Sequence, residues 1–422
     1  MLDRLNNHCV TSLLSTDAYK YSMGQFVVHR YPGAWVRVTF KCRSDEKIGC
    51  LKPAIDRELD YLCTLRYTDE EIAYLRTIDW LAPDFVDYLR RFYMFREQVH
   101  TEVDADGQLV MWAEGPWRDV IWFEVPCLAI VEELYTKRHL NREYKEQELD
   151  VFWNDTQRRL EEKVKLFNEL YARHPFTLSE FGLRRRFSRT WHDYVVGYLK
   201  DNCAAFVGTS DVSLARKYNV KPMGTMAHEM YMGLQGCKVQ LREVQRETWR
   251  QWMEEFRGKN GILLSDIFGF NACLNDMDWY VANSFPGCRH DSGDPFTWGE
   301  KLIAKYERLG IDPKTKVGCW SDNLNPELAC EIAERFSGRI KVAFGIGTNL
   351  VNDTPIKPLS IVMKLTHAGY DEKHMIPVLK LSDSPGKGMC PDPALVEYAK
   401  HVYGYRQLES LNEYMDRQQE AL

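Results

Sequence analysis

The chain has 422 residues, of which 45% are hydrophobic and 27% are charged, and it carries a formal net charge of -6 with a pI near 6.1. A chain of this length can bury a large core and predicts two domains, or one barrel with additions. Its charges form no long run of one sign, which argues against a nucleic-acid-binding tail or a membrane-surface patch.

The N-terminal stretch MLDRLNNHCV carries charge early and lacks the apolar core of a signal peptide, so we expect a protein that is not secreted. The 12 cysteines are scattered without any C-x-x-C pair, which predicts reduced thiols in the cytoplasm. The longest apolar stretch, residues 120–135, contains Glu124 and Pro126 and is too short to span a bilayer. We expect a buried strand there, leading into a helix with Pro126 in its first turn.

Residues 1–140 mix strand-like alternation, as in WVRVTFKCR at residues 35–43, with helical stretches such as DWLAPDFVDYLRRF at residues 79–92. From residue 150 the pattern becomes regular. A helix is predicted by the spacing of Leu160, Val164, Phe167 and Leu170, and short apolar runs then alternate with amphipathic helices. The runs are PFTLSEFG, CAAFVGTS, GILLSD, KVGCWSD and IKVAFGIG.

Each of these runs ends in Gly, Ser, Thr or Asp, as parallel strands do where they meet functional loops. The alternation predicts an α/β barrel or a doubly wound sheet with its chemistry at the carboxyl ends of the strands. Asp294 and Asn325 each stand before a proline and are expected to cap the next helix. Asp211, in GTSDVSLARK, is expected to cap a third. For any single loop, an ordinary capped turn is the competing interpretation.

Three loops carry groups suited to a phosphorylated sugar. FGIGTNL, at residues 344–350, brings backbone N–H groups and the Thr348 hydroxyl to the end of a strand, which suits a phosphate. RHDSGDP, at residues 289–295, offers Asp291 and Ser292 for ribose hydroxyls or for Mg²⁺ with its waters, and Asp322 offers the same chemistry in SDNLNPE. No Ser/His/Asp triad and no metal-binding cluster of His and Cys is present in the sequence.

Two further motifs carry a cluster of positive charge or a lone histidine. In EFGLRRRFS, at residues 180–188, consecutive side chains point in different directions, so one or two arginines are expected to face the site while the rest pair on the surface. GTMAHEMYMG, at residues 224–233, opens like the zinc motif H-E-x-x-H, but Met232 stands where the second histidine is required. The zinc interpretation therefore fails, and His228 is not committed to a metal. Taken alone, a single histidine is more often a structural residue than a nucleophile.

Together these motifs closely resemble the bacterial nicotinate phosphoribosyltransferase family. The resemblance is carried by SLLSTDAYKYSM, GPWRDVIWFEVP, FGLRRRFS, VGTSDVSLA, GTMAHE, RHDSGDPFTWGEK, WSDNL, FGIGTNL and KLSDSPGK, in this order. It implies an irregular α/β barrel of the type II phosphoribosyltransferase kind over residues 141–365. An N-terminal α/β domain over residues 1–140 would be completed by residues 366–422.

The resemblance implies an ATP-coupled enzyme of the ligase class that forms a C–N bond. It would convert nicotinate, phosphoribosyl pyrophosphate, ATP and water to nicotinate mononucleotide, pyrophosphate, ADP and phosphate, the first step of NAD biosynthesis from nicotinate. Mg²⁺ is the implied cofactor. The implied assembly is a homodimer with shared sites, without nucleic-acid or membrane partners.

Residue roles follow from the same resemblance. His228 would be phosphorylated by ATP, while Glu229 would orient its ring or only favour the first helical turn. Tyr19, supplied by the neighbouring subunit, would stack on the pyridine ring opposite Phe181. The remaining groups would surround nicotinate (Arg184, Thr225, Arg289), hold ribose, pyrophosphate and Mg²⁺ (Asp291, Ser292, Gly293, Ser321, Asp322), and hold the 5-phosphate (Gly345, Gly347, Thr348).

The sequence departs from the family pattern at Leu183, Asp211 and Met230, where Thr, Asn and a bulkier aromatic are frequent. Three alternatives remain at this point, one of which is a catalytically silent protein that binds a phosphorylated sugar without releasing pyrophosphate. The other two are enzymes. One is an enzyme of the same fold that prefers nicotinamide, which the arginines disfavour. The other is a barrel metallohydrolase that uses Asp266, Asp291 and Asp322.

Overall fold

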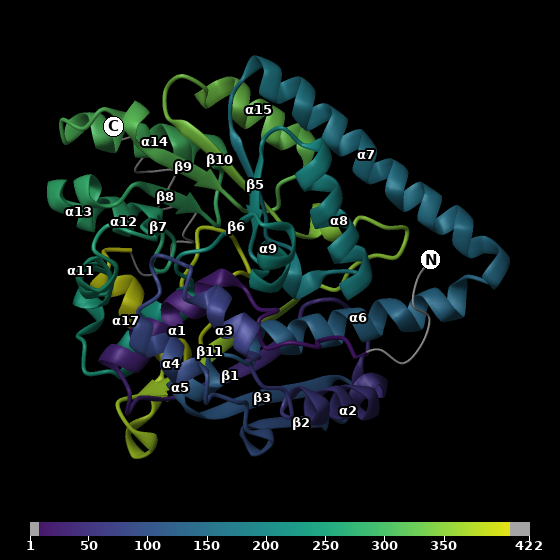
Figure 1. The fold of residues 1–422 in the computed structure, drawn as a ribbon. Coiled ribbons are helices and arrows are strands. Elements are labelled where there is room, and N and C mark those ends of the chain that lie inside the picture. The colour runs from purple at the N-terminus through teal and green to yellow at the C-terminus, as the bar shows by residue number, and fades with distance from the viewer. Residues whose placement is uncertain (1–7, 406–422) are drawn as a thin grey trace.

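The computed structural model describes residues 8–405, which form two sheets with helices between and around them (Figure 1). An antiparallel sheet has the order β12-β11-β1-β3-β2, and a parallel sheet of seven strands has the order β6-β5-β4-β10-β9-β8-β7. The antiparallel strands are β1 (Trp35–Cys42), β2 (Val99–Val103), β3 (Leu109–Pro116), β11 (Ile361–Gly369) and β12 (Ile376–Pro377). The parallel strands are β4 (Thr177–Glu180), β5 (Phe206–Thr209), β6 (Lys221–Pro222), β7 (Ile262–Leu264), β8 (Gly287–His290), β9 (Val317–Trp320) and β10 (Lys341–Ile346).

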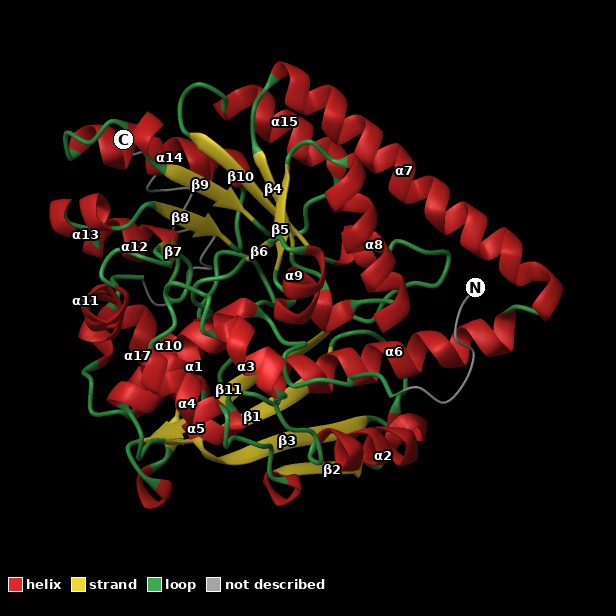
Figure 2. Ribbon diagram, viewed as in Figure 1, coloured by secondary structure: helices red, strands yellow, loops and turns green. Residues whose placement is uncertain are grey.

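Helices separate the two sheets and cover the outside of the parallel one (Figure 2). In the first half they are α1 (Ala18–Arg30), α2 (Lys52–Leu62), α3 (Asp69–Leu75), α4 (Pro83–Leu89), α5 (Trp117–Val120), α6 (Glu124–Glu143), α7 (Leu149–Arg173), α8 (Arg189–Asn202) and α9 (Val212–Tyr218). In the second half they are α10 (His228–Gly236), α11 (Val244–Phe256), α12 (Phe270–Asp276), α13 (Trp279–Ser284), α14 (Pro295–Arg308), α15 (Pro326–Phe336), α16 (Thr348–Val351) and α17 (Pro393–Val402). Helices α1 and α6 lie between the sheets, and α7 runs along the outer edge of the barrel.

The predicted α/β barrel is confirmed, because the five apolar runs form β4, β5, β7, β9 and β10 of one curled parallel sheet. Two strands, β6 and β8, were not predicted from the sequence. The first has only two residues, and the second is the polar sequence GCRH. All three expected helix caps are present, with Asp211, Asp294 and Asn325 accepting hydrogen bonds from backbone N–H groups in the first turns of α9, α14 and α15.

The strand expected near residue 120 is wrong. Residues 117–120 form the short helix α5, and α6 begins at Glu124 with Pro126 in its first turn, as expected for the helix. Residues 124–133 are all buried. A helix that is buried on every side has the same continuous apolar sequence as a buried strand, so sequence periodicity cannot separate them.

The C-terminal part of the chain returns to the antiparallel sheet. Strand β11 pairs with β1 along its whole length, from Trp35 with Gly369 to Cys42 with Ile361. The return strand therefore begins at Ile361, ahead of the predicted limit at residue 365. The domain limits themselves stay predictions, and residues 406–422 of the predicted C-terminal segment lie outside the described residues.

The barrel is open between β6 and β7, and the segment after β6 crosses this opening. The hydroxyl of Thr225 donates a hydrogen bond to the carbonyl oxygen of Ile262 in β7 at 2.7 Å. Helix α10 then starts at His228. This opening between β6 and β7 is the seam of the barrel. The segment that crosses the seam places His228 at the carboxyl ends of the strands, beside the antiparallel sheet.

Two glycines fix the position of α10 by close approach. A Cβ on Gly233 would lie 2.1 Å from the ring of Trp117, and one on Gly236 would lie 2.2 Å from the backbone of Ala368 in β11. Only glycine therefore lets this helix rest directly on the antiparallel sheet.

We expect Gly236→Ala to lower the free energy of unfolding by about 1–3 kcal/mol, because overpacking against backbone outweighs the better helix propensity of alanine. Thermal or urea unfolding measures the change. Gly33→Ala is the matched control, since its Cβ would have its nearest neighbour at an ordinary 3.7 Å. Equal stability of the two variants would contradict the close packing.

Within residues 8–405, no helix is long and apolar enough to cross a membrane. All 12 cysteines are free thiols.

Candidate active site

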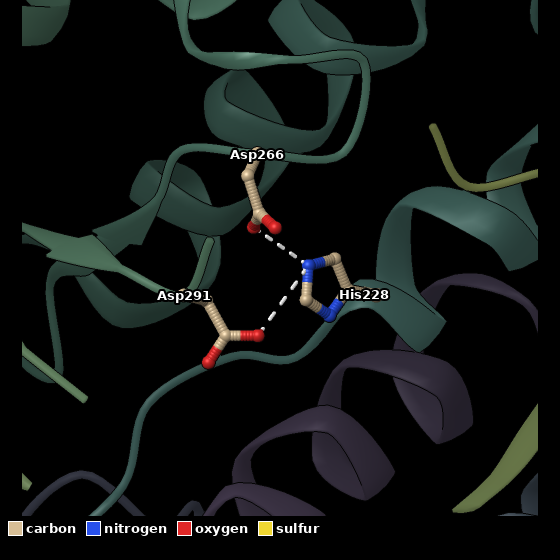
Figure 3. A group of neighbouring side chains, drawn as sticks. All are labelled: His228, Asp266 and Asp291. Carbon is tan, nitrogen blue, oxygen red and sulfur yellow. Dashed lines mark hydrogen bonds and ion pairs between the residues drawn. The ribbon is translucent and has the colours of Figure 1, made fainter. Parts of the chain in front are cut away.

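The side chain of His228 lies between two carboxylates at the barrel seam (Figure 3). Its Nε2 is 2.7 Å from Oδ1 of Asp266, which follows β7, and 3.9 Å from Oδ2 of Asp291, which follows β8. Both contacts end on the same ring nitrogen, and Nδ1 points away from the two carboxylates. The two acids come from neighbouring strand ends, as expected for a barrel site.

Asp266 is held as an anion. Its Oδ2 accepts a hydrogen bond from the hydroxyl of Ser292 at 2.7 Å and lies 3.0 Å from Nζ of Lys380. Burial opposes ionisation, but Lys380 and His228 hold the pKa of Asp266 well below its usual value. An ionised acceptor requires Nε2 of His228 to carry the proton, which leaves a lone pair on Nδ1.

The imidazole of His228 is neutral at physiological pH. Burial and the nearby ammonium of Lys380 lower the pKa of His228 from 6.5 to about 4, against the opposing effect of Asp266. A neutral ring with one nitrogen fixed by a carboxylate is the arrangement that makes the other nitrogen a nucleophile.

A cavity of about 50 Å³ opens beside His228 and lies between the two sheets. It is lined by Tyr19, Arg184, Arg289, Asp291 and Lys364, among others. The guanidinium of Arg184 lies over the ring of Tyr19, 5.6 Å from its centroid. Three of the five predicted nicotinate residues (Tyr19, Arg184, Arg289) therefore meet in one cavity.

Tyr19 lines this cavity in its own chain. The expectation that the neighbouring subunit supplies Tyr19 to the assembled site stays a prediction. The residue stands near the start of α1, which packs against the barrel seam, and its hydroxyl is buried without a hydrogen-bond partner among the described residues.

Phe181 and Thr225 lie outside the lining of the cavity. The Phe181 ring packs on Gly345, where an added Cβ would lie 2.3 Å from it, and an added Cβ on Gly347 would lie 2.9 Å from the Phe181 carbonyl oxygen. The Thr225 hydroxyl is already bonded to Ile262. Because Gly345 and Gly347 have no side chain, the segment that follows β4 can pack directly against them. Thr348 begins the short helix α16 next to these glycines.

The three consecutive arginines separate as the sequence suggested, with one difference. Arg184 faces the cavity and Arg185 is exposed. Arg186 is buried rather than on the surface, and its guanidinium lies 3.6 Å from Glu133 and 3.8 Å from Asp211. Arg186 therefore links α6 to the barrel through these two ion pairs.

Glu229 does not orient the ring of His228. Its Oε1 accepts a hydrogen bond from Nε1 of Trp117 at 2.9 Å, and its Oε2 pairs with the buried ammonium of Lys20. Lys20 also lies 2.7 Å from Glu124. Asp266 performs the orienting role that the sequence analysis considered for Glu229, while Glu229 ties α10 to α1 and α5.

The residues predicted for ribose, pyrophosphate and Mg²⁺ gather at the ends of β8 and β9. The Ser321 hydroxyl donates to the carbonyl oxygen of His290 at 2.8 Å and lies 3.3 Å from Asp291. Gly293 has a φ of 85°, a conformation that favours glycine, and its N–H donates to the hydroxyl of Ser384. Asp322 pairs with Lys387.

These carboxylates differ in their fitness for a metal ion. Among residues 8–405, one group of three possible ligands lies close together: His228, Asp266 and Asp291. Lys380 neutralises Asp266, and Lys387 neutralises Asp322. Asp291 is 30% exposed and its nearest cation, Arg289, is 3.9 Å away, so it is the carboxylate that suits Mg²⁺. The metallohydrolase alternative would need Asp266, Asp291 and Asp322 together, but Asp322 lies outside this group, and Asp266 and Asp322 are each paired with a lysine.

Several site residues were not singled out from the sequence, namely Asp17, Lys20, Glu124, Lys364 and Lys380. Four of them stand in motifs that carried the resemblance, DAYK, WFEVP and KLSDSPGK. The motifs were the available signal, but the paired contacts are visible only in the fold. Of the departures, Leu183 and Met230 are buried, and Asp211 caps α9.

Comparisons with known proteins identify the family. The nicotinate phosphoribosyltransferase family model matches residues 176–407, and the model of the N-terminal domain of that family matches residues 14–132. A nicotinate phosphoribosyltransferase of Bordetella petrii is 42% identical over 402 residues, covering 93% of this chain and 98% of the relative. One from Acinetobacter baylyi is 41% identical, covering 93% and 96%. The crystal structure of a nicotinate phosphoribosyltransferase from Vibrio cholerae has a TM-score of 0.89 and 37% identity, covering 99% of this chain and 100% of that one.

Proposed function

The chain belongs to the nicotinate phosphoribosyltransferase family and is an enzyme of that activity, and from this premise we propose that it couples the transfer to ATP through His228. The observation that carries the proposal is the neutral, buried imidazole whose Nε2 is fixed by Asp266.

In the proposed first step, Nδ1 of His228 attacks the γ-phosphorus of ATP, and ADP leaves. The Nε2 proton remains on the hydrogen bond to Asp266, which stabilises the charge that develops on the ring. A phosphoryl group on Nδ1 adds negative charge and three acceptor oxygens to the cavity that His228 and Arg289 both line. Hydrolysis of the P–N bond then releases phosphate and returns the neutral ring.

In the proposed transfer step, the ring nitrogen of nicotinate attacks C1′ of phosphoribosyl pyrophosphate and pyrophosphate leaves. The ribosyl group becomes positively charged as the bond to pyrophosphate breaks, so preorganised anions and hydrogen-bond groups lower the barrier. Asp291 lies where it can face the ribose, together with Ser321 and the Gly293 turn. Mg²⁺, held by Asp291 through water, would neutralise charge on the pyrophosphate when bound.

Nicotinate is favoured over nicotinamide as the acceptor. The relatives are named for nicotinate, and three cations, on Arg184, Arg289 and Lys364, line the cavity. Comparing the turnover of the two bases decides between them, and equal use of nicotinamide would contradict the proposal.

The direct test is an assay of the purified chain for nicotinate mononucleotide and ADP together. We expect both products to form at similar rates when nicotinate, phosphoribosyl pyrophosphate, ATP and Mg²⁺ are present. Full-rate nicotinate mononucleotide formation with no ATP consumed would remove the coupling while leaving the transferase activity.

We also propose a homodimer in the cytoplasm, supported by the family resemblance and by the free thiols. A mass in solution of twice 49.5 kDa would support the dimer. In the proposed dimer the two sites would be shared between subunits, with Tyr19 supplied to the neighbouring site.

A further inference from the structure

The three cations that line the cavity differ in whether they already have an anionic partner. Nε of Arg184 is 3.1 Å from Asp17, and its Nη1 is 3.5 Å from Glu124. Arg289 has a looser partner, Asp291, at 3.9 Å. Lys364 has no hydrogen bond or ion pair with any residue in the range 8–405. The cavity therefore contains one ammonium group whose partner is missing from the protein.

Lys364 stands in the middle of β11, where it pairs across the sheet with Thr39 of β1. The charged groups that act on it are Glu124 on α6, Arg184 after β4, Asp291 after β8 and Lys380 after β12. The two acids are already engaged, Glu124 by Lys20 at 2.7 Å and Asp291 by Arg289 and Ser321. Two cations and two engaged acids leave the ammonium without local compensation.

Lys364 is half-buried. A cation that is partly withdrawn from water without an anionic partner is unfavourable, and an anionic ligand in the cavity offsets that cost. The other lining groups suit a flat aromatic acid. The ring of Tyr19, stacked against Arg184, forms one wall, and Met232, Met363 and Leu365 supply apolar surface. The ligand that complements this cavity carries one negative charge on an aromatic ring.

We propose that Lys364, supplied by the C-terminal return strand β11, binds the carboxylate of nicotinate and sets the preference for the acid over the amide. This inference rests on the proposed function and deepens it. Arg184, which already has two carboxylate partners, then serves to hold Tyr19 and the cavity wall. Lys364 is a specificity-determining residue that the sequence motifs did not single out.

The test is the steady-state kinetics of Lys364→Met. Loss of one charge-assisted contact predicts a KM for nicotinate that rises roughly 10- to 100-fold. The weak turnover of nicotinamide is expected to change less than threefold. Lys41→Met is the matched control, because Lys41 is exposed on the adjacent strand β1.

A second arm separates nicotinate from the phosphate groups as the anion bound by Lys364. If the ammonium instead holds a phosphate, Lys364→Met would raise the KM for phosphoribosyl pyrophosphate or slow labelling of the protein by γ-labelled ATP, with an unchanged KM for nicotinate. That result would overturn the inference. The proposed function fails separately, if the wild-type chain forms no nicotinate mononucleotide.

A third arm uses pH. Burial lowers the pKa of Lys364 from 10.5 to about 8, while Glu124 opposes the shift. The ammonium is thus present below pH 8 and lost as the pH rises through it, so kcat/KM for nicotinate is expected to fall above pH 8. In Lys364→Arg the cation persists, and the fall should move to higher pH. An identical alkaline profile in wild type and Lys364→Arg would contradict the assignment.

Discussion

Replacing His228 by alanine is expected to abolish a phosphoprotein label that the wild-type chain acquires from γ-labelled ATP and Mg²⁺. The label should be acid-labile and stable to base, as phosphohistidine is, and it should fall to background in His228→Ala. The ring is the nucleophile, because its Nε2 is bonded to Asp266 and its Nδ1 is free to attack. Slow transfer of the phosphoribosyl group should remain, without dependence on ATP.

The control for this variant is His374→Ala, since His374 is exposed, pairs with Asp371 and does not line the cavity. It should retain the full label. A label that persists in His228→Ala would falsify the assignment of the phosphorylated residue. Loss of label together with loss of the folded state would be recognised by circular dichroism, and His228→Asn then provides a second variant of closer shape.

The pH dependence of labelling follows from the lowered pKa of His228. The pKa of His228 is about 4 in the folded chain, below its ordinary value of 6.5, so the nucleophile stays neutral as the pH falls through 6.5. The labelling rate should be flat between pH 8 and 5.5 as far as this ring is concerned. The same depressed pKa contributes stability above pH 6.5 that is lost as the pH falls toward 4, because the unfolded chain takes up the proton first.

The sequence predicted the barrel more fully than it predicted the contacts within the site. Strand ends such as GILLSD and KVGCWSD place Asp266 and Asp322 on one face of the barrel, since the carboxyl ends of parallel strands meet there. Which acid reaches His228 depends on the seam between β6 and β7, which the Thr225 hydroxyl spans. No local pattern encodes that seam, so Asp266 remained one acid among three.

The same limit applies to charge pairing. FGLRRRFS shows that an arginine follows β4, but only the fold shows that Arg184 is already compensated by Asp17 and Glu124. Lys364 lies in an alternating strand that reads as an ordinary half-exposed sheet position. Lys364 reaches the cavity only because β11 returns to pair with β1, a contact between distant parts of the chain. Propensity and periodicity describe single elements, whereas the missing partner of a charge is a property of several elements together.

Replacing Asp266 by asparagine is expected to slow phosphorylation of His228 by roughly 10³- to 10⁴-fold, the loss found where an asparagine imposes the wrong histidine tautomer. The carboxylate now accepts the Nε2 proton at 2.7 Å. An amide in its place can donate to Nε2, which moves the ring proton to Nδ1 and blocks the attacking lone pair. Rapid-quench labelling with γ-labelled ATP measures the rate.

A change of tautomer also predicts where the remaining phosphate is attached. The wild-type label should be on Nδ1, and the residual label of Asp266→Asn should shift to Nε2, which phosphorus NMR of the denatured, base-stabilised protein distinguishes. Asp276→Asn is the matched control, because Asp276, the last residue of α12, is also a buried aspartate and pairs with Arg242 and Arg246. It should lower stability without altering the labelling rate or the position of the phosphate. If Asp266 only supports the fold, its replacement would slow labelling but leave the phosphate on Nδ1. A slow Asp266→Asn variant that is still phosphorylated on Nδ1 would therefore contradict a role of Asp266 in setting the tautomer.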